Sequence, residues 1–247
     1  MLSLRLKILA KFAFIGDLHS QLVPMMRAVD YCVANDLLPI FLGDLFDSRC
    51  EISESVAVYK FARKCQDELG AIVLDSNHQE KLCRYLKKGK VRLDLVPELA
   101  RSISEFASSD VPAQELTQWL SNCPLGTVIR DDQGKEFRAA HAYFSSRIVV
   151  PDYDNLYLLT ECDKRERTLC QYGPVNTKGD RRVWWKESQK RNWVRVSGHY
   201  HVIYKDEKSL LIDGGLGGVT RSWFCKEEPI LVLYDSTSGN LVEFPKM

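Results

Sequence analysis

The stretch KFAFIGDLHSQLVPMMRAVDYCVANDLLPIFLGDLFD, residues 11–47, decides the fold class of this chain. It opens with a short apolar run, continues through an amphipathic segment of helical length and returns to an apolar run at 38–42. The alternation then repeats, with a helical pattern at 52–69 and a third apolar run at 71–74. Short apolar runs that alternate with amphipathic helices are typical of buried parallel strands covered by helices. The sequence therefore predicts an α/β fold.

The rest of the chain follows a less regular plan. Two further helical patterns occupy 97–122, and residues 131–134 supply turn residues between two expected strands of a hairpin. Residues 151–192 are polar, aromatic and irregular, so we interpret them as a long insertion on the substrate side and not as a separate domain. We therefore expect one domain over residues 1–247.

The composition is ordinary for a soluble globular protein, with 45% hydrophobic and 27% charged residues. A net charge of +1 gives no general attraction for nucleic acid or for an anionic membrane. No stretch is long and apolar enough to span a bilayer. The eight cysteines form no CxxC pair and, without a secretory signal, are expected to be reduced thiols. We expect a cytoplasmic protein that does not bind membranes, and we infer no obligate protein partner.

Five polar motifs each follow a strand-like apolar run, and all five histidines of the chain belong to them. Loops at the carboxyl ends of neighbouring parallel strands lie close together, so motifs far apart in sequence can build one pocket. One motif alone would be weak evidence, because Gly-Asp pairs are common in turns. Their combination predicts a functional site. In order they are GDLH (16–19), GDLFD (43–47), SNH (76–78), a single His141 and GHYH (198–201).

These motifs offer carboxylate, amide and imidazole donors, a mixture that suits borderline divalent ions. Seven donors are too many for one ion, whereas two ions about 3.5–4 Å apart that share a carboxylate would use them all. Such a pair would clamp the attacking and leaving oxygens of a displacement at phosphorus. We expect two divalent ions, with manganese as the first choice and iron, zinc or nickel as alternatives. The expected donors are Asp17, His19, Asp44, Asn77, His141, His199 and His201.

In order and approximate spacing, the motifs GDxH, GDxxD, NH, H and GHxH resemble those of calcineurin-like metallophosphoesterases, over residues 14 to about 220. The resemblance implies an α/β/β/α fold, in which a sandwich of two mixed sheets is flanked by helices. It also implies His78 as the proton donor to the leaving group, positioned by Asp47. By the same resemblance, the first ion is held by Asp17, His19 and His201, the second by Asn77, His141 and His199, and both by Asp44.

Physical chemistry supports these roles. A water shared by two cations is acidified enough to supply a hydroxide nucleophile at neutral pH. An alkoxide leaving group still needs a proton. His78 follows Asn77 directly, so it can face the substrate, and the carboxylate of Asp47 would support its charged form.

Two longer stretches narrow the resemblance. Residues 76–91 and 172–202 resemble the phosphatase domain of bacterial polynucleotide kinase-phosphatases and related dinucleoside-tetraphosphatases. Residues 119–142 resemble the corresponding region across the protein serine/threonine phosphatase branch. The resemblance implies a hydrolase of phosphate esters or anhydrides. Its preferred substrates would be nucleotides, dinucleoside polyphosphates or nucleic-acid phosphate ends.

Four residues are candidates for substrate binding. Arg181, Arg182 and Trp184 belong to a basic and aromatic patch that could hold phosphates and stack bases. The alternative is a solvated loop whose tryptophans anchor it to the core. Arg49 is the candidate for the phosphate-binding arginine that the family places directly after GDxxD, although Ser48 displaces it by one position.

Two other functions stay open. A protein serine/threonine phosphatase would carry the same motifs and would act on a phosphoprotein. A binding or scaffold protein with a decayed active site is suggested by the displaced Arg49 and by Ser76 and Gln79, which stand where the branch has Gly and Glu. The run LIDGGLGG, residues 211–218, lacks the GxxxxGK spacing of a phosphate-binding loop, and we expect a turn beside the metal pocket.

Overall fold

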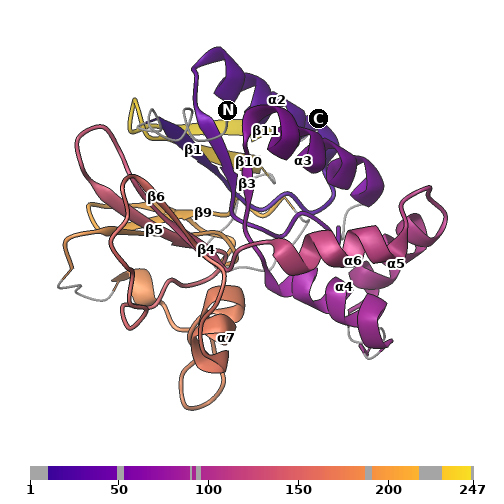
Figure 1. Cartoon of the computed structure of the whole chain (residues 1–247). Helices are drawn as coiled ribbons and strands as arrows, with labels where there is room; N and C mark the ends of the chain where they lie inside the picture. The colour runs from indigo at the N-terminus through magenta and orange to yellow at the C-terminus, as the bar shows by residue number, and fades with distance from the viewer. Residues whose placement is uncertain are drawn as a thin grey trace.

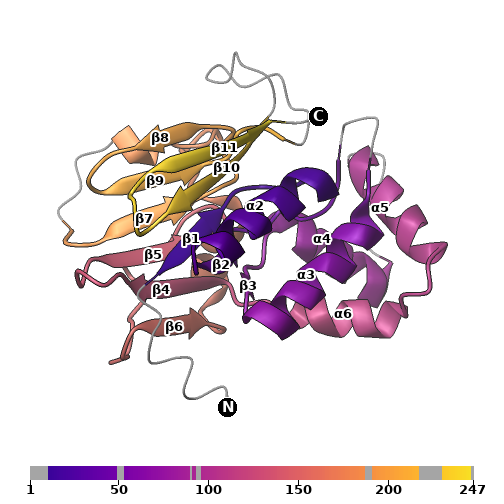
Figure 2. The same ribbon diagram turned by 90° about the horizontal axis from the view of Figure 1, so that it is seen from above.

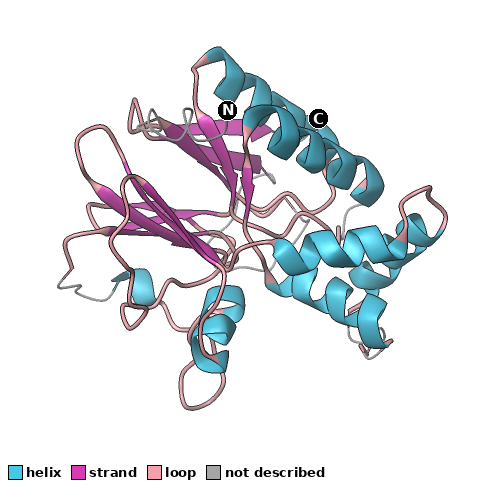
Figure 3. Ribbon diagram, viewed as in Figure 1, coloured by secondary structure: helices cyan, strands magenta, loops and turns pink. Residues whose placement is uncertain are grey.

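In the computed structural model, two β-sheets pack face to face with helices on both outer sides (Figure 1 and Figure 3). The structure describes residues 11–48, 53–89, 91–92, 96–186, 191–216 and 230–245. The order of layers is helices, first sheet, second sheet, helices. This arrangement confirms the expected α/β/β/α fold.

The first sheet has five strands in the order β11-β10-β1-β2-β3. Strands β1, β2 and β3 are parallel, as the alternating pattern predicts, and β10 and β11 extend the sheet in antiparallel fashion. Every residue of β1 and β2 is buried, which explains why these runs are apolar throughout. The bounds are β1 Phe12–Ile15, β2 Leu38–Phe41, β3 Ile72–Val73, β10 Ile230–Asp235 and β11 Leu241–Pro245.

The second sheet has six strands in the order β6-β4-β5-β7-β9-β8. Strands β4 and β5 pair antiparallel around residues 131–134, which confirms the expected hairpin. Strands β5, β7 and β9 are parallel, so their carboxyl ends lie at one edge. The bounds are β4 Gly126–Arg130, β5 Glu136–Ala140, β6 Leu156–Leu159, β7 Val194–Ser197, β8 Ile203–Lys205 and β9 Ser209–Ile212.

Five helices cover the first sheet and its β3 edge. Helix α2 contacts β1, β2, β10 and β11, and α3 packs beside β3. Helix α4 contacts both α5 and α6, and α5 also contacts α3, so this group lies next to α3 (Figure 2). Among the described residues, no helix has both the length and the apolar character needed to cross a membrane. The bounds are α2 Leu22–Ala34, α3 Ser55–Leu69, α4 Asn77–Lys88, α5 Pro97–Ala107 and α6 Ala113–Asn122.

Apolar side chains fill the space between the two sheets. The first sheet contributes residues such as Phe12, Phe14 and Ile40, and the second contributes Phe137 and Val196. Phe12 and Phe14 contact Phe137 with ring centroids 5.4 and 6.0 Å apart. This packing fixes the ends of the two sheets relative to each other, which is what a site assembled from both sheets requires.

The segment 151–192 contains more regular structure than its sequence suggests. It includes β6, helix α7 (Lys164–Tyr172) and the short helix η3 (Trp184–Lys186). Strand β6 pairs with β4 at the edge of the second sheet, and Cys170 of α7 packs in a cluster with Val128 and Leu159 of that sheet. An edge strand and a surface helix need few apolar residues, which explains the polar sequence. The organisation of residues 1–247 as one domain stays a prediction.

Candidate metal centre

The predicted donors lie in loops that leave the carboxyl ends of strands in both sheets. GDLH follows β1, GDLFD follows β2 and SNH follows β3, while His141 follows β5 and GHYH follows β7. Backbone hydrogen bonds join these loops: the amides of Leu18 and His19 donate to the carbonyl of Asp44 at 3.1 and 2.8 Å. The amide of Gly198 donates to the carbonyl of His141 at 2.9 Å. The five motifs therefore converge on one place.

Several residues of the motifs have a left-handed backbone conformation, which residues other than glycine usually avoid. A left-handed conformation costs a non-glycine residue about 1–3 kcal/mol and persists only where the surrounding fold imposes it. Such residues cluster at functional sites. The non-glycine motif residues with positive φ are His19 (45°), Asp44 (44°), Asp47 (69°), His199 (67°) and His201 (50°).

Two motif glycines make room for the donors. Gly43 has a φ of 106°, and a Cβ at this position would lie 2.7 Å from Cβ of Ser76 and 3.1 Å from Nδ1 of His141. A Cβ on Gly198 would overlap the carboxylate of Asp17. The Gly-Asp and Gly-His pairs therefore have a steric cause, because a larger residue would push a donor out of place.

The first set of donors, which we call the inner group, comprises Asn77, His141 and His199. Nδ1 of His141 lies 3.1 Å from the carbonyl oxygen of Leu42, which fixes the proton on Nδ1 and leaves Nε2 with its lone pair. That Nε2 lies 2.9 Å from Oδ1 of Asn77 and 3.0 Å from Nδ1 of His199. All three residues are at most 5% exposed. The inner group therefore points its donor atoms at one another inside the protein.

The second set, the outer group, comprises Asp17, His19 and His201. Nδ1 of His19 lies 3.1 Å from the carbonyl oxygen of Asp47, so its proton is placed there and Nε2 is left as a donor atom. The carboxylate of Asp17 accepts a hydrogen bond from the amide of His199 at 2.9 Å through Oδ2. Each of these contacts orients a donor without using the atom that would bind an ion.

Asp44 lies between the two groups. Its Oδ2 is 3.4 Å from Nε2 of His141 on the inner side, 3.8 Å from Nε2 of His19 and 3.9 Å from Nε2 of His78. Two triads of potential ligand atoms share this carboxylate, one with His19 and His78 and the other with His141 and His199. A carboxylate common to two sets of donors is the arrangement that a pair of ions requires.

Buried atoms without partners show that the donor set fits cations. Among the described residues, no hydrogen bond reaches Oδ1 of Asp17, Nε2 of His19 or Oδ1 of Asp44, although each atom is buried. An unpaired buried polar atom is costly, and most buried polar atoms in proteins have a partner. Carboxylate oxygens and neutral imidazole nitrogens of this kind are ligands for divalent ions. The donors therefore fit divalent metal ions.

The ionisable groups of the site affect one another strongly. Burial raises the pKa of Asp17, and the charges of Asp213 and Asp44 raise it further. Burial also opposes ionisation of Asp44, but His141 and the other nearby imidazoles outweigh it, so the pKa of Asp44 lies well below its usual value. Burial lowers the pKa of His199, which keeps this imidazole neutral and able to bind an ion.

His78 and Asp47 form a pair beside the donor set. Nδ1 of His78 lies 2.8 Å from Oδ2 of Asp47, and its Nε2 faces Asp44. Burial lowers the pKa of His78, but the carboxylates of Asp44 and Asp47 outweigh this, so the pKa lies above its usual value. The amide of Asp47 donates to Oγ of Ser102 at 3.1 Å, so α5 supports the pair from behind.

The predicted substrate-binding arginines lie in different settings. Arg181 is exposed, and its Nη1 donates to the carbonyl oxygen of His199 at 3.1 Å, which places it at the rim of the donor set. Arg182 is also exposed, and its amide donates to the carbonyl of Pro174. Arg49 lies outside the described residues.

The expected role of Trp184 in stacking bases does not fit its position. Its side chain is only 2% exposed, and its ring packs against Tyr143 and Tyr200 with centroids 5.3 and 6.1 Å away. Trp185 is also buried, at 5% exposed. These rings are covered by protein on the faces that a base would need, so this part of the prediction is corrected: the tryptophans anchor the segment to the core.

Asp213 is a residue of the site that the sequence analysis did not single out. It follows β9, is fully buried, and its Oδ2 lies 3.2 Å from Nδ1 of His201 while accepting from the amide of the same residue at 2.6 Å. A carboxylate on one imidazole nitrogen orients the other nitrogen toward a metal ion. The available signal was its place after an apolar run, as in the other motifs, within LIDGG.

Comparison with known proteins gives an independent result. A family model of calcineurin-like phosphoesterases matches residues 10–229. The fold is similar to a crystal structure provisionally described as a diadenosine tetraphosphatase, with a TM-score of 0.59 and 19% identity over 97% of this chain and 95% of that one. It is also similar to hypothetical protein PH1004 from Pyrococcus horikoshii OT3, with a TM-score of 0.58 and 8% identity over 95% and 87% of the two chains. None of the curated proteins compared with the sequence matches it.

At these identities the two structures show a common fold and nothing finer. The family model is stronger evidence for the family, because the matched residues 10–229 contain every motif from GDLH to GHYH. The order of the motifs, their convergence around Asp44 and the family match agree with one another. The chain belongs to the calcineurin-like phosphoesterase family, whose members hydrolyse phosphoester bonds.

Proposed function

We propose that the chain is a two-metal phosphoesterase that acts on nucleotides, dinucleoside polyphosphates or nucleic-acid phosphate ends. The observation that carries the proposal is the position of Asp44, whose Oδ2 lies within 3.4–3.9 Å of imidazole nitrogens on both sides. A single ion would leave one set of these donors unused. Manganese is our first choice of ion, and we expect the enzyme to work in the cytoplasm.

The chain would hold one ion with the outer group and the other with the inner group, with Asp44 shared. Bound divalent ions would acidify a water molecule and neutralise charge on the phosphate. The residues themselves keep the donors in position: Asp47 and Leu42 hold His19 and His141 through backbone carbonyls. Because these contacts use Nδ1, each Nε2 is presented to the centre in a fixed tautomer.

His78 is the group that we assign to protonation of the leaving oxygen. The carboxylate of Asp47 accepts a hydrogen bond from Nδ1–H of His78, so Nε2–H of the charged imidazole faces the centre. The raised pKa of His78 favours the protonated form that an acid needs. Such a proton matters for an alkoxide leaving group and much less for one that is stable as an anion.

Among the arginines that the structure describes, Arg181 is the one best placed to contact the phosphate of a substrate. It is exposed, and one of its nitrogens already rests on the carbonyl of His199, so the rest of the guanidinium lies next to the donor set. A planar guanidinium can bind two phosphate oxygens at once. The nucleotide part of the proposal draws its support from the resemblance of residues 76–91 and 172–202 to nucleotide phosphatases and from the name of one similar structure.

A substrate panel tests the proposal. We would measure manganese-dependent hydrolysis of p-nitrophenyl phosphate, bis(p-nitrophenyl) phosphate, diadenosine tetraphosphate, RNA with 2′,3′-cyclic ends and a phosphopeptide, with Asp44→Asn as control. Turnover of the nucleotide substrates that the control abolishes is the expected result. Turnover of the phosphopeptide alone would favour a protein phosphatase. Equal inertness of wild type and control with every ion would favour a binding or scaffold protein.

A further inference from the structure

The structure contains a basic pocket outside the metal centre, and none of its lining residues belongs to the five motifs. It lies between α4, α6 and α7 and has a volume of about 310 Å³. Four cationic side chains and two carboxylates line it, which gives a local charge of +4 − 2 = +2 if all are ionised. The whole chain has a net charge of only +1, so the excess is a local feature. The charged lining residues are Arg84, Lys87, Lys88, Arg167, Asp75 and Glu80.

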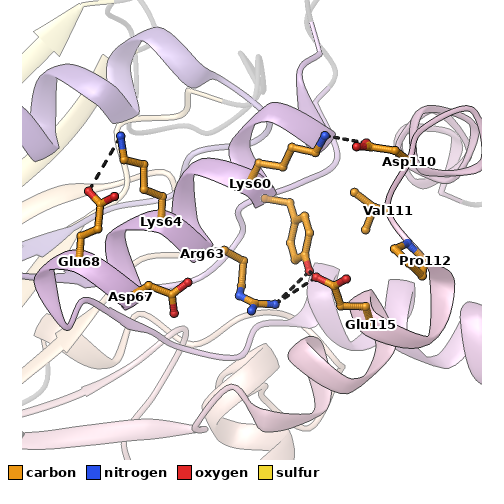
Figure 4. A pocket seen from close by; sticks show the side chains of 10 residues that line it. Lys60, Arg63, Lys64, Asp67, Glu68, Asp110, Val111, Pro112 and Glu115 are labelled. Atoms are coloured by element: carbon orange, nitrogen blue, oxygen red, sulfur yellow. Dashed lines mark hydrogen bonds and ion pairs between the residues drawn. The ribbon is translucent and has the colours of Figure 1, made fainter.

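A surface pocket of similar size beside α3 provides the comparison (Figure 4). Its volume is about 400 Å³, and three cations and four carboxylates line it, which gives +3 − 4 = −1. Each cation there has an acidic partner: Lys60 lies 2.6 Å from Asp110, Arg63 lies 3.3 Å from Glu115, and Lys64 lies 3.9 Å from Glu68. These ion pairs leave no uncompensated cation for a ligand.

The cations of the α4–α7 pocket are far less compensated. Arg84 lies 3.6 Å from Glu80, but this carboxylate also accepts from the hydroxyl of Tyr172 at 3.2 Å. Lys87 donates to the neutral hydroxyl of Ser121 at 2.8 Å. Within the described parts of the chain, no carboxylate lies within 4 Å of the charged groups of Lys87, Lys88 or Arg167. The positive charges of Lys87, Lys88 and Arg167 therefore remain available to an anion in this pocket.

The more buried of the two acidic residues, Asp75, is already engaged by neighbouring donors. Asp75 is 8% exposed, and its two oxygens already accept hydrogen bonds at 2.8 Å each, from the amide of Ser76 and from Nε2 of Gln171. Its carboxylate is therefore engaged by the backbone and by α7.

We propose that the α4–α7 pocket binds a phosphate or polyphosphate group at a site separate from the metal centre. Lys87 and Lys88 of α4 and Arg167 of α7 line the pocket from two helices and suit such a ligand. A guanidinium binds phosphate oxygens in pairs, and an ammonium supplies a point charge. The pocket also lies on the helix that begins with Asn77 and His78, so a ligand there contacts the same helix that carries part of the candidate active site.

Lys87 and Lys88 have a simpler role that the test must separate. Both lie in the last turn of α4, where cations stabilise the negative end of the helix dipole. That role needs no ligand and involves no residue of α7. It predicts that replacing the lysines lowers helix stability, and it predicts no effect of Arg167 on anion binding.

Calorimetry with inorganic pyrophosphate tests the proposal. The titration uses the full chain with Asp44→Asn in EDTA, so no ion at the metal centre can bind the ligand and failure of the proposed function would not affect the result. The pocket variant is Lys87→Gln with Arg167→Gln, and the matched control is Lys60→Gln with Arg63→Gln, which removes the same charges from the α3 pocket. We expect one pyrophosphate to bind per chain. The pocket variant should lower its affinity about tenfold or more, and the control should lower it less than about twofold.

Equal weakening in both variants would overturn the proposal, because it would show general electrostatic attraction. No binding to the chain that keeps its cations would overturn it as well. A footprint on wild-type protein in EDTA guards against a variant that fails to fold: pyrophosphate should slow acetylation of Lys87 and Lys88 at least about fivefold relative to Lys60 and Lys64. If pyrophosphate changed the acetylation rates of the two lysine pairs by the same factor, or changed neither rate, the proposal would again be overturned.

Discussion

The inner and outer groups of the metal centre are held in different ways. The inner group is in mutual contact, with Nε2 of His141 within 3.0 Å of Asn77 and His199. A backbone carbonyl orients one histidine in each group, Leu42 for His141 and Asp47 for His19. In the outer group a side chain that is not a donor, Asp213, also orients His201. The comparison teaches that the donor atoms of the inner group lie close together, whereas the outer group relies on the additional carboxylate of Asp213. The two halves should therefore respond differently to mutation.

The largest effect is expected where the two halves join. Asp44→Asn removes the carboxylate that both groups face, so catalysis by either ion should suffer. We expect kcat/KM for p-nitrophenyl phosphate to fall on the order of 1,000-fold or more, which corresponds to several kcal/mol of lost transition-state stabilisation. Steady-state kinetics with saturating manganese measures this. A fall below about tenfold would mean that Asp44 is not shared.

The next effect concerns His78, which stands on the outer side with His19. His78→Ala should lower kcat for an alkyl phosphate about 100-fold, because the leaving alkoxide loses its acid. The effect on p-nitrophenyl phosphate should be much smaller, since p-nitrophenolate leaves without a proton. Equal losses for both substrates would assign His78 to metal binding instead.

The same pair predicts a pH dependence. Asp44 and Asp47 raise the pKa of His78, so its protonated form persists to higher pH and activity on alkyl phosphates is lost as the pH rises through that pKa. Asp47→Asn removes one of these charges and lowers the pKa. The alkaline decline of kcat should then begin at a lower pH in the variant. An unchanged profile would show that another group controls the decline.

A smaller effect separates the two halves directly. Asp213→Asn removes the charge that orients His201, and loss of such a supporting carboxylate typically weakens metal affinity about 10- to 100-fold. We expect weakening of one manganese ion and little change in the other, measured by calorimetry. Asp206→Asn, on the exposed turn between β8 and β9, is the matched control. Weakening of both ions equally would remove the distinction between the inner and outer groups.

The smallest effect should come from the rim. Arg181→Ala leaves every donor in place and removes only the guanidinium that rests on His199. We expect KM for a nucleotide substrate to rise about fivefold with little change in kcat, because a surface contact to phosphate contributes modestly. Arg182→Ala serves as the neighbouring control. Equal effects of the two variants would point to a general loss of positive charge.

The parallel strands and the convergence of the motifs could be predicted because both depend on local sequence. A buried strand such as β1 is apolar throughout, and a polar motif directly after it lies at a strand end whatever the rest of the fold does. The seven predicted donors were found in this way. Their roles as ligands stay predictions, although the structure places the seven residues in one cluster that includes Asp44.

Other features depend on packing that a linear pattern does not reveal. Trp184 belongs to a stretch that suits either base stacking or a buried anchor, and only its contacts with Tyr143 and Tyr200 decide between them. Asp213 lies in a Gly-rich turn, where Asp is common for conformational reasons alone. Strand β6 is four residues long and half-exposed, so its sequence has little of the apolar pattern that marks a buried strand. Its strand conformation depends on pairing with β4.

The central claim is that two divalent ions share Asp44, and anomalous diffraction from crystals grown with manganese tests it most directly. The account predicts two anomalous peaks about 3.5–4 Å apart, one beside the inner group and one beside the outer group, with Asp44 between them. A single peak, or two peaks without Asp44 between them, would contradict the account.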